Sequence, residues 1–178
     1  MKALKKIGIG LAVIIVLLLV ISFFLPSKIH VERSMVMHAS PDTVYGMVAD
    51  LKKWGQWSPW HKMDPNMVIT WGEKTEGVGA TYSWKSDNGE VGDGTMTISE
   101  AVPNERIKLD MYFMESKDPA YGGWTFEKTS EGVKATNTMD MDAGMNPVMR
   151  IMGLMMDNMV GKHFEEGLKN LKEIVEAK

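Results

Sequence analysis

The sequence predicts an α+β fold in which a curved antiparallel sheet of about six to seven strands wraps around a long C-terminal helix, preceded by one N-terminal transmembrane helix. Three observations lead to this prediction. An uncharged apolar run covers residues 7–25, alternating segments follow one another over residues 67–141, and a long stretch with helical periodicity begins at Pro147. A sheet with one apolar face must bury it, and the C-terminal helix is the largest element available to cover it.

The N-terminal run predicts a membrane anchor. Residues 7–25 carry no charge, and at about 1.5 Å per residue they span roughly 28 Å, close to the hydrocarbon thickness of a bilayer. Lys2, Lys5 and Lys6 precede the run, so we expect a cytoplasmic N-terminus, an anchor in the inner or cell membrane, and a periplasmic or extracellular soluble domain. The chain then divides into an anchor, residues 1–27, and a soluble domain, residues 28–178.

A cleaved signal peptide is the alternative for this segment. The apolar run is longer than the usual ~7–15 residues of a signal peptide, and Phe23-Phe24-Leu25-Pro26 offers no small-residue cleavage site. The sequence favours an uncleaved anchor but leaves cleavage open.

The composition excludes several classes of protein. The 178 residues include no cysteine, which excludes disulfides, thiolate-bound zinc, iron–sulfur clusters and thiol nucleophiles. Three of the 20 basic residues, Lys2, Lys5 and Lys6, precede the apolar run. The remainder of the chain has 17 basic and 23 acidic residues, which gives it a net charge of −6. A mildly acidic body argues against nucleic acid binding, because phosphates require a basic face. We expect no metal and no cofactor.

The soluble domain is expected to begin with a strand and a helix. Residues 29–37 alternate, and the inward face would hold Ile29, Val31, Met35 and Met37. Ser40 and Pro41 predict an N-cap followed by proline at the first helical position, so a helix should run from here to about Asp50. Residues 54–60 follow with three tryptophans, which we interpret either as a lid at a pocket mouth or as core that plugs the open end of the sheet.

The rest of the sheet is predicted as a meander. Asp87-Asn88-Gly89 predicts a tight hairpin turn, because Asn-Gly accepts positive φ, and Pro103-Asn104 and Ser130-Glu131-Gly132 predict two further turns. The clearest alternation lies over residues 106–113. The inward faces of these strands would carry Tyr82, Trp84, Met96, Ile98, Ile107, Leu109, Met111, Phe113, Trp124, Phe126, Val133, Ala135, Asn137, Met139 and Met141.

The C-terminal helix, predicted over residues 147–177, contains most of an unusual row of methionines. Met145, Met149, Met152, Met156, Met159 and His163 recur at spacings of three and four. We interpret this row as part of one continuous buried face. Met149, Met152 and Met156 would line a cavity, because methionine forms pliable walls for apolar ligands. Plain core packing is one alternative. Cu(I) ligation by thioethers is another, and it is weaker because these sulfurs fall where an apolar face is needed.

This order of elements and three short segments resemble the START-like superfamily, also called SRPBCC, and within it the polyketide cyclase/dehydrase-like branch. The segments are Ser40-Pro41-Asp42-Thr43-Val44-Tyr45, Trp54-Gly55-Gln56-Trp57-Ser58-Pro59-Trp60 and Gly77-Val78-Gly79-Ala80. The resemblance covers about residues 28–178. It implies a helix-grip fold with a deep cavity between sheet and C-terminal helix. Members bind lipids, sterols, polyketides and plant hormones, and some catalyse cyclisation or dehydration, so these motifs specify the fold better than the function.

The predicted ligand-binding residues are large inward-facing side chains and one amide. They are Trp57, Trp60, Trp84, Met96, Met111, Phe113, Trp124, Asn137, Met139, Met149, Met152 and Met156. An unpaired buried amide costs about 1–3 kcal/mol, so Asn137 should bond either to neighbouring backbone or to a polar group of the ligand. Arg33 shares the inward parity of Val31 and Met35, and it would meet a ligand carboxylate or pair with an acidic neighbour at the rim.

Three functions follow from these patterns. The leading hypothesis is a membrane-tethered binding or carrier domain for a hydrophobic small molecule, lipid-like or polyketide-like. An enzyme of the cyclase or dehydrase type is the second, and it requires an ionisable side chain with a perturbed pKa inside the cavity. No G-x-S-x-G, H-E-x-x-H or P-loop pattern occurs, so His61 and His163 remain unassigned candidates and catalysis is less favoured. The third is a filled domain that binds a protein partner.

Overall fold

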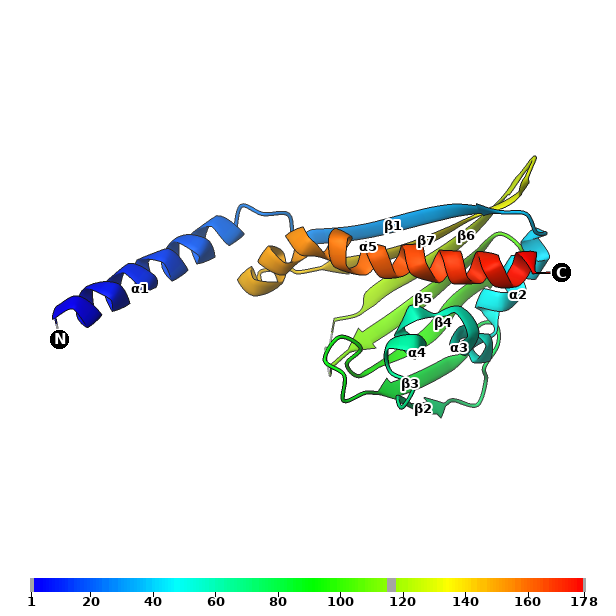
Figure 1. Ribbon diagram of the computed structural model, residues 1–178, viewed down its shortest axis with the longest axis horizontal. Helices are drawn as coiled ribbons and strands as arrows, with labels where there is room; N and C mark the ends of the chain where they lie inside the picture. The colour runs from blue at the N-terminus through cyan, green and yellow to red at the C-terminus, as the bar shows by residue number, and fades with distance from the viewer. Residues whose placement is uncertain (1, 115–117, 178) are drawn as a thin grey trace.

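The computed structural model describes residues 2–114 and 118–177 and has the predicted architecture (Figure 1). An apolar helix leads into a seven-stranded sheet, and a long helix closes the chain. The elements are α1 (Lys2–Ser22), β1 (Lys28–Met37), α2 (Pro41–Ala49), the 3-10 turn η1 (Leu51–Lys53), α3 (Trp54–Trp57), α4 (Pro59–Met63), β2 (Val68–Trp71), β3 (Thr81–Lys85), β4 (Gly94–Val102), β5 (Arg106–Phe113), β6 (Ala120–Thr129), β7 (Gly132–Asp142) and α5 (Pro147–Glu176).

The sheet is antiparallel throughout and has the strand order β1-β7-β6-β5-β4-β3-β2. Strands β2 to β7 form a meander, and β1 adds at the edge beside β7. The predicted alternation is confirmed along β5, where Ile107 and Leu109 are buried between exposed Arg106 and Lys108. The first and last strands therefore pair, although they are separated by most of the chain.

Helix α5 lies along the edge strand β1 and runs in the same direction (Figure 1). A Cβ atom at Gly153 would come within 2.8 Å of the Ile29 side chain, so the backbone of α5 packs directly on that side chain of β1. Farther along, the Arg33 guanidinium donates to Asp157 at 2.8 Å and to Glu165 at 2.6 Å. The hydrogen bond from Arg33 holds the pKa of the Asp157 carboxyl below its usual value.

The core fills the space between the concave face of the sheet and the C-terminal half of α5. Leu168 and Leu171 of α5 are fully buried there, together with Val44 and Val48 of α2. The predicted cap of α2 is confirmed, because the Ser40 side chain accepts a hydrogen bond from the Thr43 N–H and Pro41 opens the helix. The Asn146 side chain caps α5 in the same way by accepting from the N–H groups of Val148 and Met149.

Two local features differ in detail from the prediction. β3 and β4 form the predicted hairpin, but a loop over residues 86–93 joins them and not a tight turn at Asn88-Gly89. The Asn88 carbonyl accepts from the N–H groups of Val91 and Gly92, and Gly92 supplies the positive φ of 62°. Helix α1 ends at Ser22 and not at Leu25, and its last turn is closed by a hydrogen bond from the Leu25 N–H to the Ser22 carbonyl.

The prediction that the methionine row is one buried face was wrong. Met145, Met152 and Met159 are 70%, 46% and 52% exposed. Toward the sheet, α5 presents Gly153, Met156 and Val160, so Met156 is the member of the predicted row that faces the pocket. Apolar residues occupy several sides of the first half of this helix, so the spacing of the methionines alone does not identify the buried side.

Candidate functional site

A pocket of about 300 Å³ lies between the sheet and α5. It falls at the lower end of the range for small-molecule sites, ~300–1,000 Å³. Its lining is mostly apolar and comes from α3 to α5 and from β3 to β7. The lining residues are Trp54, Trp57, Ser58, Trp60, His61, Met67, Tyr82, Trp84, Glu90, Val91, Met96, Leu109, Met111, Phe113, Gly122, Trp124, Asn137, Thr138, Met139, Met141, Met156, Val160 and Phe164.

The register of the sheet explains why a hollow remains here. Gly122 of β6 pairs with Leu109 on one side and Met139 on the other. A Cβ atom at Gly122 would lie 3.0 Å from the Met111 methyl group and 3.2 Å from Leu109. Because Gly122 has no side chain, those of Met111 and Leu109 can lie against the sheet at this position of the pocket lining.

The tryptophan segment forms a wall of this pocket and is also part of the core. Trp57 packs against Trp54 and Trp124 with ring centroids 4.8 Å and 5.5 Å apart. Its indole N–H donates to the Met47 carbonyl at 3.2 Å. Trp60 packs on Phe164 of α5 with centroids 6.1 Å apart. Trp54 and Trp57 are buried, so the core interpretation holds for these two, whereas Trp60 is half-buried and lines the pocket.

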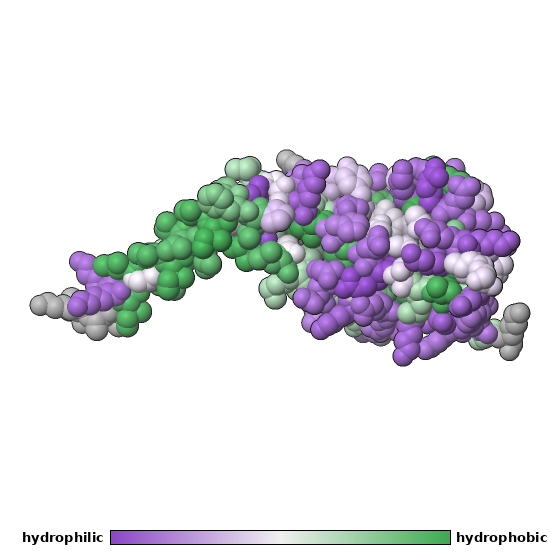
Figure 2. All heavy atoms as spheres, turned by 90° about the horizontal axis from the view of Figure 1, so that it is seen from above, coloured by the Kyte–Doolittle hydropathy of each residue, from purple (hydrophilic) through white to green (hydrophobic). Residues whose placement is uncertain are grey.

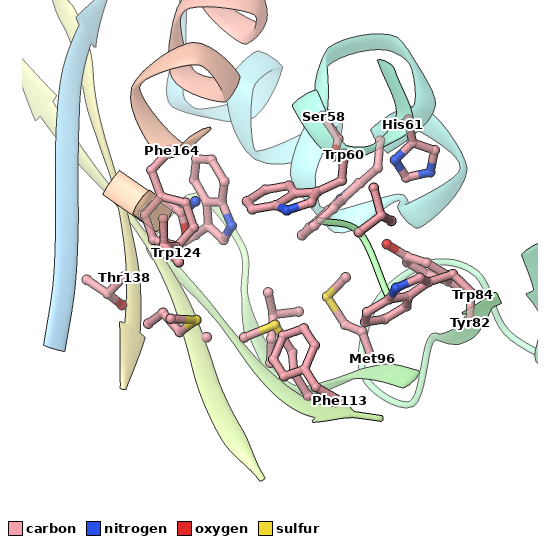
Figure 3. Close-up of a pocket in the computed structure, with 18 of the residues that line it drawn as sticks. Ser58, Trp60, His61, Tyr82, Trp84, Met96, Phe113, Trp124, Thr138 and Phe164 are labelled. Carbon is pink, nitrogen blue, oxygen red and sulfur yellow. The ribbon is translucent and has the colours of Figure 1, made fainter. Parts of the chain in front are cut away.

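The polar groups of the pocket are few, and several lack protein partners. Figure 3 shows Trp124, Thr138 and Phe164 at one end of the cavity and His61, Tyr82 and Trp84 at the other. Among the described residues, the buried Trp124 Nε1 and His61 Nδ1 have no hydrogen-bond partner. The Asn137 side chain, 9% exposed, has no hydrogen bond to that part of the chain either. Unpaired polar groups in an apolar pocket are available to a ligand.

Burial shifts the pKa values of two titratable rings, those of His61 and Tyr82, at the end of the pocket opposite Trp124. It lowers the pKa of the His61 imidazole, so the ring is neutral at pH 7. It raises the pKa of the Tyr82 phenol, which therefore stays protonated. The ring centroids of His61 and Tyr82 lie 6.3 Å apart. The pocket thus has hydrogen-bonding groups without charge on either ring.

Ten of the twelve predicted ligand-binding residues line the pocket. Met149 and Met152 do not, because the first turns of α5 extend past it along β1. Arg33 lies outside as well, and its ion pairs with Asp157 and Glu165 correspond to the rim pairing that the sequence left open. Sequence analysis missed Val160 and Phe164, which follow Met156 at spacings of four and eight and so lie on the same side of α5. It also missed Gly122, which no periodicity indicates.

The family of the chain follows from its match to a known profile. The profile described as "Polyketide cyclase / dehydrase and lipid transport" matches residues 28–176. The chain belongs to this family. The resemblance predicted from the three short segments is therefore confirmed, and the match covers the whole sheet and α5.

Solved structures share the fold of this polyketide cyclase/dehydrase family member. The di-domain ARO/CYC StfQ from the steffimycin biosynthetic pathway has a TM-score of 0.66 at 12% identity, covering 84% of this chain and 51% of that one. Protein SA2116 from Staphylococcus aureus, of unknown function, has a TM-score of 0.61 at 17% identity, covering 84% and 94%. Protein CV1439 from Chromobacterium violaceum has a TM-score of 0.56 at 19% identity, covering 84% and 99%. No curated protein matched at a significant level.

Membership of the polyketide cyclase/dehydrase family agrees with the chemistry of the pocket. The family supports a hydrophobic ligand-binding fold, and the pocket here is lined largely by tryptophan, phenylalanine and methionine. These structural similarities lie below 25% identity, so they establish the helix-grip fold and leave the ligand to be argued from the site itself.

Proposed function

We propose that this protein is a membrane-tethered carrier or binding domain for a hydrophobic small molecule. The observation that carries the proposal is the apolar pocket, about 300 Å³ in volume, whose buried donor Trp124 Nε1 has no partner among the described residues. A domain filled by its own side chains, the protein-partner alternative, would leave no such space. Apolar walls supply affinity and a few polar groups supply orientation in ligand pockets of this kind.

The polar groups narrow the class of ligand. Trp124 and Asn137 are paired neighbours on β6 and β7, so the indole N–H and the amide lie at the same level of the sheet. An indole can only donate, whereas an amide both donates and accepts. We therefore propose a ligand with an extended apolar body and a carbonyl or hydroxyl oxygen near Trp124, as in a lipid-like or polyketide-like molecule.

The tether is the second part of the proposal. Among the described residues, one helix is long and apolar enough to cross a membrane, Lys5–Ser22 within α1. Of the side chains described in α1, Ser22 is buried and the others are exposed, and Lys5 and Lys6 lie at the N-terminal end. An exposed helix of this composition is stable in a bilayer and not in water. The basic end favours a cytoplasmic N-terminus, with the body in the periplasm or outside the cell.

Native mass spectrometry tests the carrier function. The full chain, purified from its host and released from detergent, is expected to carry an apolar molecule that organic extraction removes. Trp124→Phe keeps an aromatic ring and removes the unpaired N–H, so it should lower affinity for the re-added molecule about tenfold. Because the smaller ring also leaves space in the core, urea unfolding of the variant confirms that it is folded under the conditions of the binding assay. Ligand-free protein that binds nothing across a panel of lipids and fatty acids would contradict the proposal.

A second candidate function is catalysis of the cyclase or dehydrase type. His61 favours it, because a neutral imidazole with a free Nδ1 inside an apolar pocket can accept a proton from a bound substrate. The test incubates the extracted molecule with the wild type and with His61→Gln. A product lighter by one water with the wild type alone supports dehydration. An unchanged molecule with both proteins supports carriage.

His61 also predicts a dependence of stability on pH. Burial lowers the pKa of the ring below ~6.5, its unfolded value, so the unfolded chain binds the proton more readily. The free energy of unfolding should therefore fall as the pH drops through 6.5 toward the folded-state pKa. One proton limits the slope to about 1.4 kcal/mol per pH unit, and solvent access to the ring keeps it below that limit.

Urea unfolding of the wild type and of His61→Gln between pH 7.5 and 5 measures this contribution. The difference between the two proteins isolates His61 from the other titrating groups. Parallel pH profiles would show that the ring is hydrated in the folded state.

A further inference from the structure

The first half of α5 has an apolar outer face that is largely exposed. Its exposed fractions are high: 59% for Val148, 60% for Leu154 and 59% for Met155. We call this set the outer face of α5. It consists of Val148, Ile151, Met152, Leu154, Met155 and Met159, and the exposed Met145 lies just before the helix. Such a long apolar stripe on an exposed helix indicates a surface that is covered in the working protein.

The two charged side chains in this stretch, Arg150 and Asp157, point away from the outer face and are hydrogen-bonded to other parts of the protein. The guanidinium of Arg150 donates to the carbonyls of Gly144, Phe23 and Leu25 at 2.7 Å, 2.8 Å and 3.2 Å. Asp157 is held by Arg33. With both charged side chains turned toward protein, Asn158 is the polar residue left between the apolar ones.

The outer face changes character abruptly after Val160. Residues 18 apart lie on the same side of an α-helix, since 18 residues make five turns. Ile151 and Met155 therefore occupy the same side as Lys169 and Glu173. The outward residues beyond Val160 are charged: Lys162, Glu165, Glu166, Lys169 and Glu173. The same helix thus has an apolar outer half and a charged outer half.

The apolar half is the one that adjoins α1. Arg150 fixes the turn after α1 through Phe23 and Leu25, and the Ala143 N–H donates to the Ser27 carbonyl at 2.8 Å. Helices α1 and α5 are in contact. Figure 2 shows apolar colour continuing from α1 onto the adjoining end of the body, whereas the rest of this view is mainly hydrophilic. The outer face of α5 therefore begins where the membrane span would end.

We infer that the outer face of α5 lies in the interfacial region of the bilayer that α1 crosses. This inference rests on the proposed tether. A helix with one apolar side lies in the plane of the interface and buries that side among the headgroups and upper acyl chains. The face carries no basic residues, so its insertion depends on apolar contact and not on anionic lipid.

This placement brings the pocket next to the membrane. Met156 and Val160 line the pocket from the same turns of α5 that carry Met155 and Met159 on the outside. One helix then separates the bound molecule from the lipid. An apolar ligand taken from the leaflet would need to travel only the width of this helix and would not cross open water.

Site-directed spin labelling of the full chain in phosphatidylcholine nanodiscs tests the inference. The absence of cysteine allows each label to be introduced as a single substitution. Met155→Cys reports on the outer face, and Glu173→Cys is the matched control on the same side of the same helix. Val13→Cys, within α1, reports on the tether. Collision with oxygen and with a water-soluble nickel chelate measures the depth of each label.

We expect the labels at 155 and 13 to favour oxygen over the chelate several-fold and the label at 173 to favour the chelate. Anionic lipid or high salt should leave unchanged the relative accessibility of the label at 155 to oxygen and to the chelate. Water exposure at 155 with lipid exposure at 13 would overturn the inference and leave the tether intact. Water exposure at both would overturn the tether and the inference together. A label at 155 shielded from both reagents would assign the face to a second copy or another protein and also overturn it.

Discussion

Replacing Trp57 with alanine is expected to lower the free energy of unfolding by about 3–5 kcal/mol, the range for deleting a buried tryptophan. Its side chain is 2% exposed and contacts the rings of Trp54 and Trp124. A side chain at Gly167 of α5 would lie 3.8 Å from the Trp57 ring. The substitution would leave a cavity where α3, β6 and α5 meet, and it would remove a wall of the pocket.

Urea unfolding of the full chain in detergent measures this loss, monitored by circular dichroism. Gln56→Ala is the matched control, because Gln56 is exposed and adjacent in sequence; its effect should stay within about 0.5 kcal/mol. A loss below about 1 kcal/mol for Trp57→Ala would mean that the tryptophan segment is a movable lid and not part of the core.

Replacing Val160 with tryptophan is expected to reduce ligand affinity by at least about 100-fold, or ~2.7 kcal/mol. Val160 is half-buried on α5 and lines the pocket beside Met156 and Phe164. An indole at this position would project into a pocket of about 300 Å³ and overlap with the bound molecule. The fold should tolerate the substitution better than a closed core would, because the added volume enters empty space.

Titration of the extracted molecule into each variant, followed by native mass spectrometry, measures this effect. Lys162→Trp adds the same ring at an exposed position of α5 and should leave affinity unchanged. Equal occupancy in the wild type and Val160→Trp would place the ligand outside this pocket and contradict the assignment of the site.

The strands of the sheet could be predicted because their physical cause is local. Along β5 each residue alternates between core and solvent, so Ile107 and Leu109 are identifiable from parity alone. The same holds for the cap at Ser40 and for the apolar run in α1, whose length and composition depend on no distant residue. These local patterns, with the three short segments, were enough to identify the helix-grip fold.

Parity also located most of the site, because a helix-grip pocket is lined by the inward face of its sheet. Trp124, Asn137 and Met139 were placed in this way. It failed where a side chain is missing or where every side chain is apolar. Gly122 has no side chain to enter a pattern, and the methionines of α5 occur on both the buried and the exposed side.

The sequence by itself determined the elements, their order, the family and the apolar character of the pocket wall. Only the tertiary structure decided which side of α5 faces the sheet, that Arg33 pairs with Asp157 and Glu165, and that His61 Nδ1 and Trp124 Nε1 are buried without partners among the described residues. These properties depend on contacts such as that between Arg33 and Asp157, 124 positions apart. Local periodicity holds no information about such contacts, because they are set by how the packed elements meet.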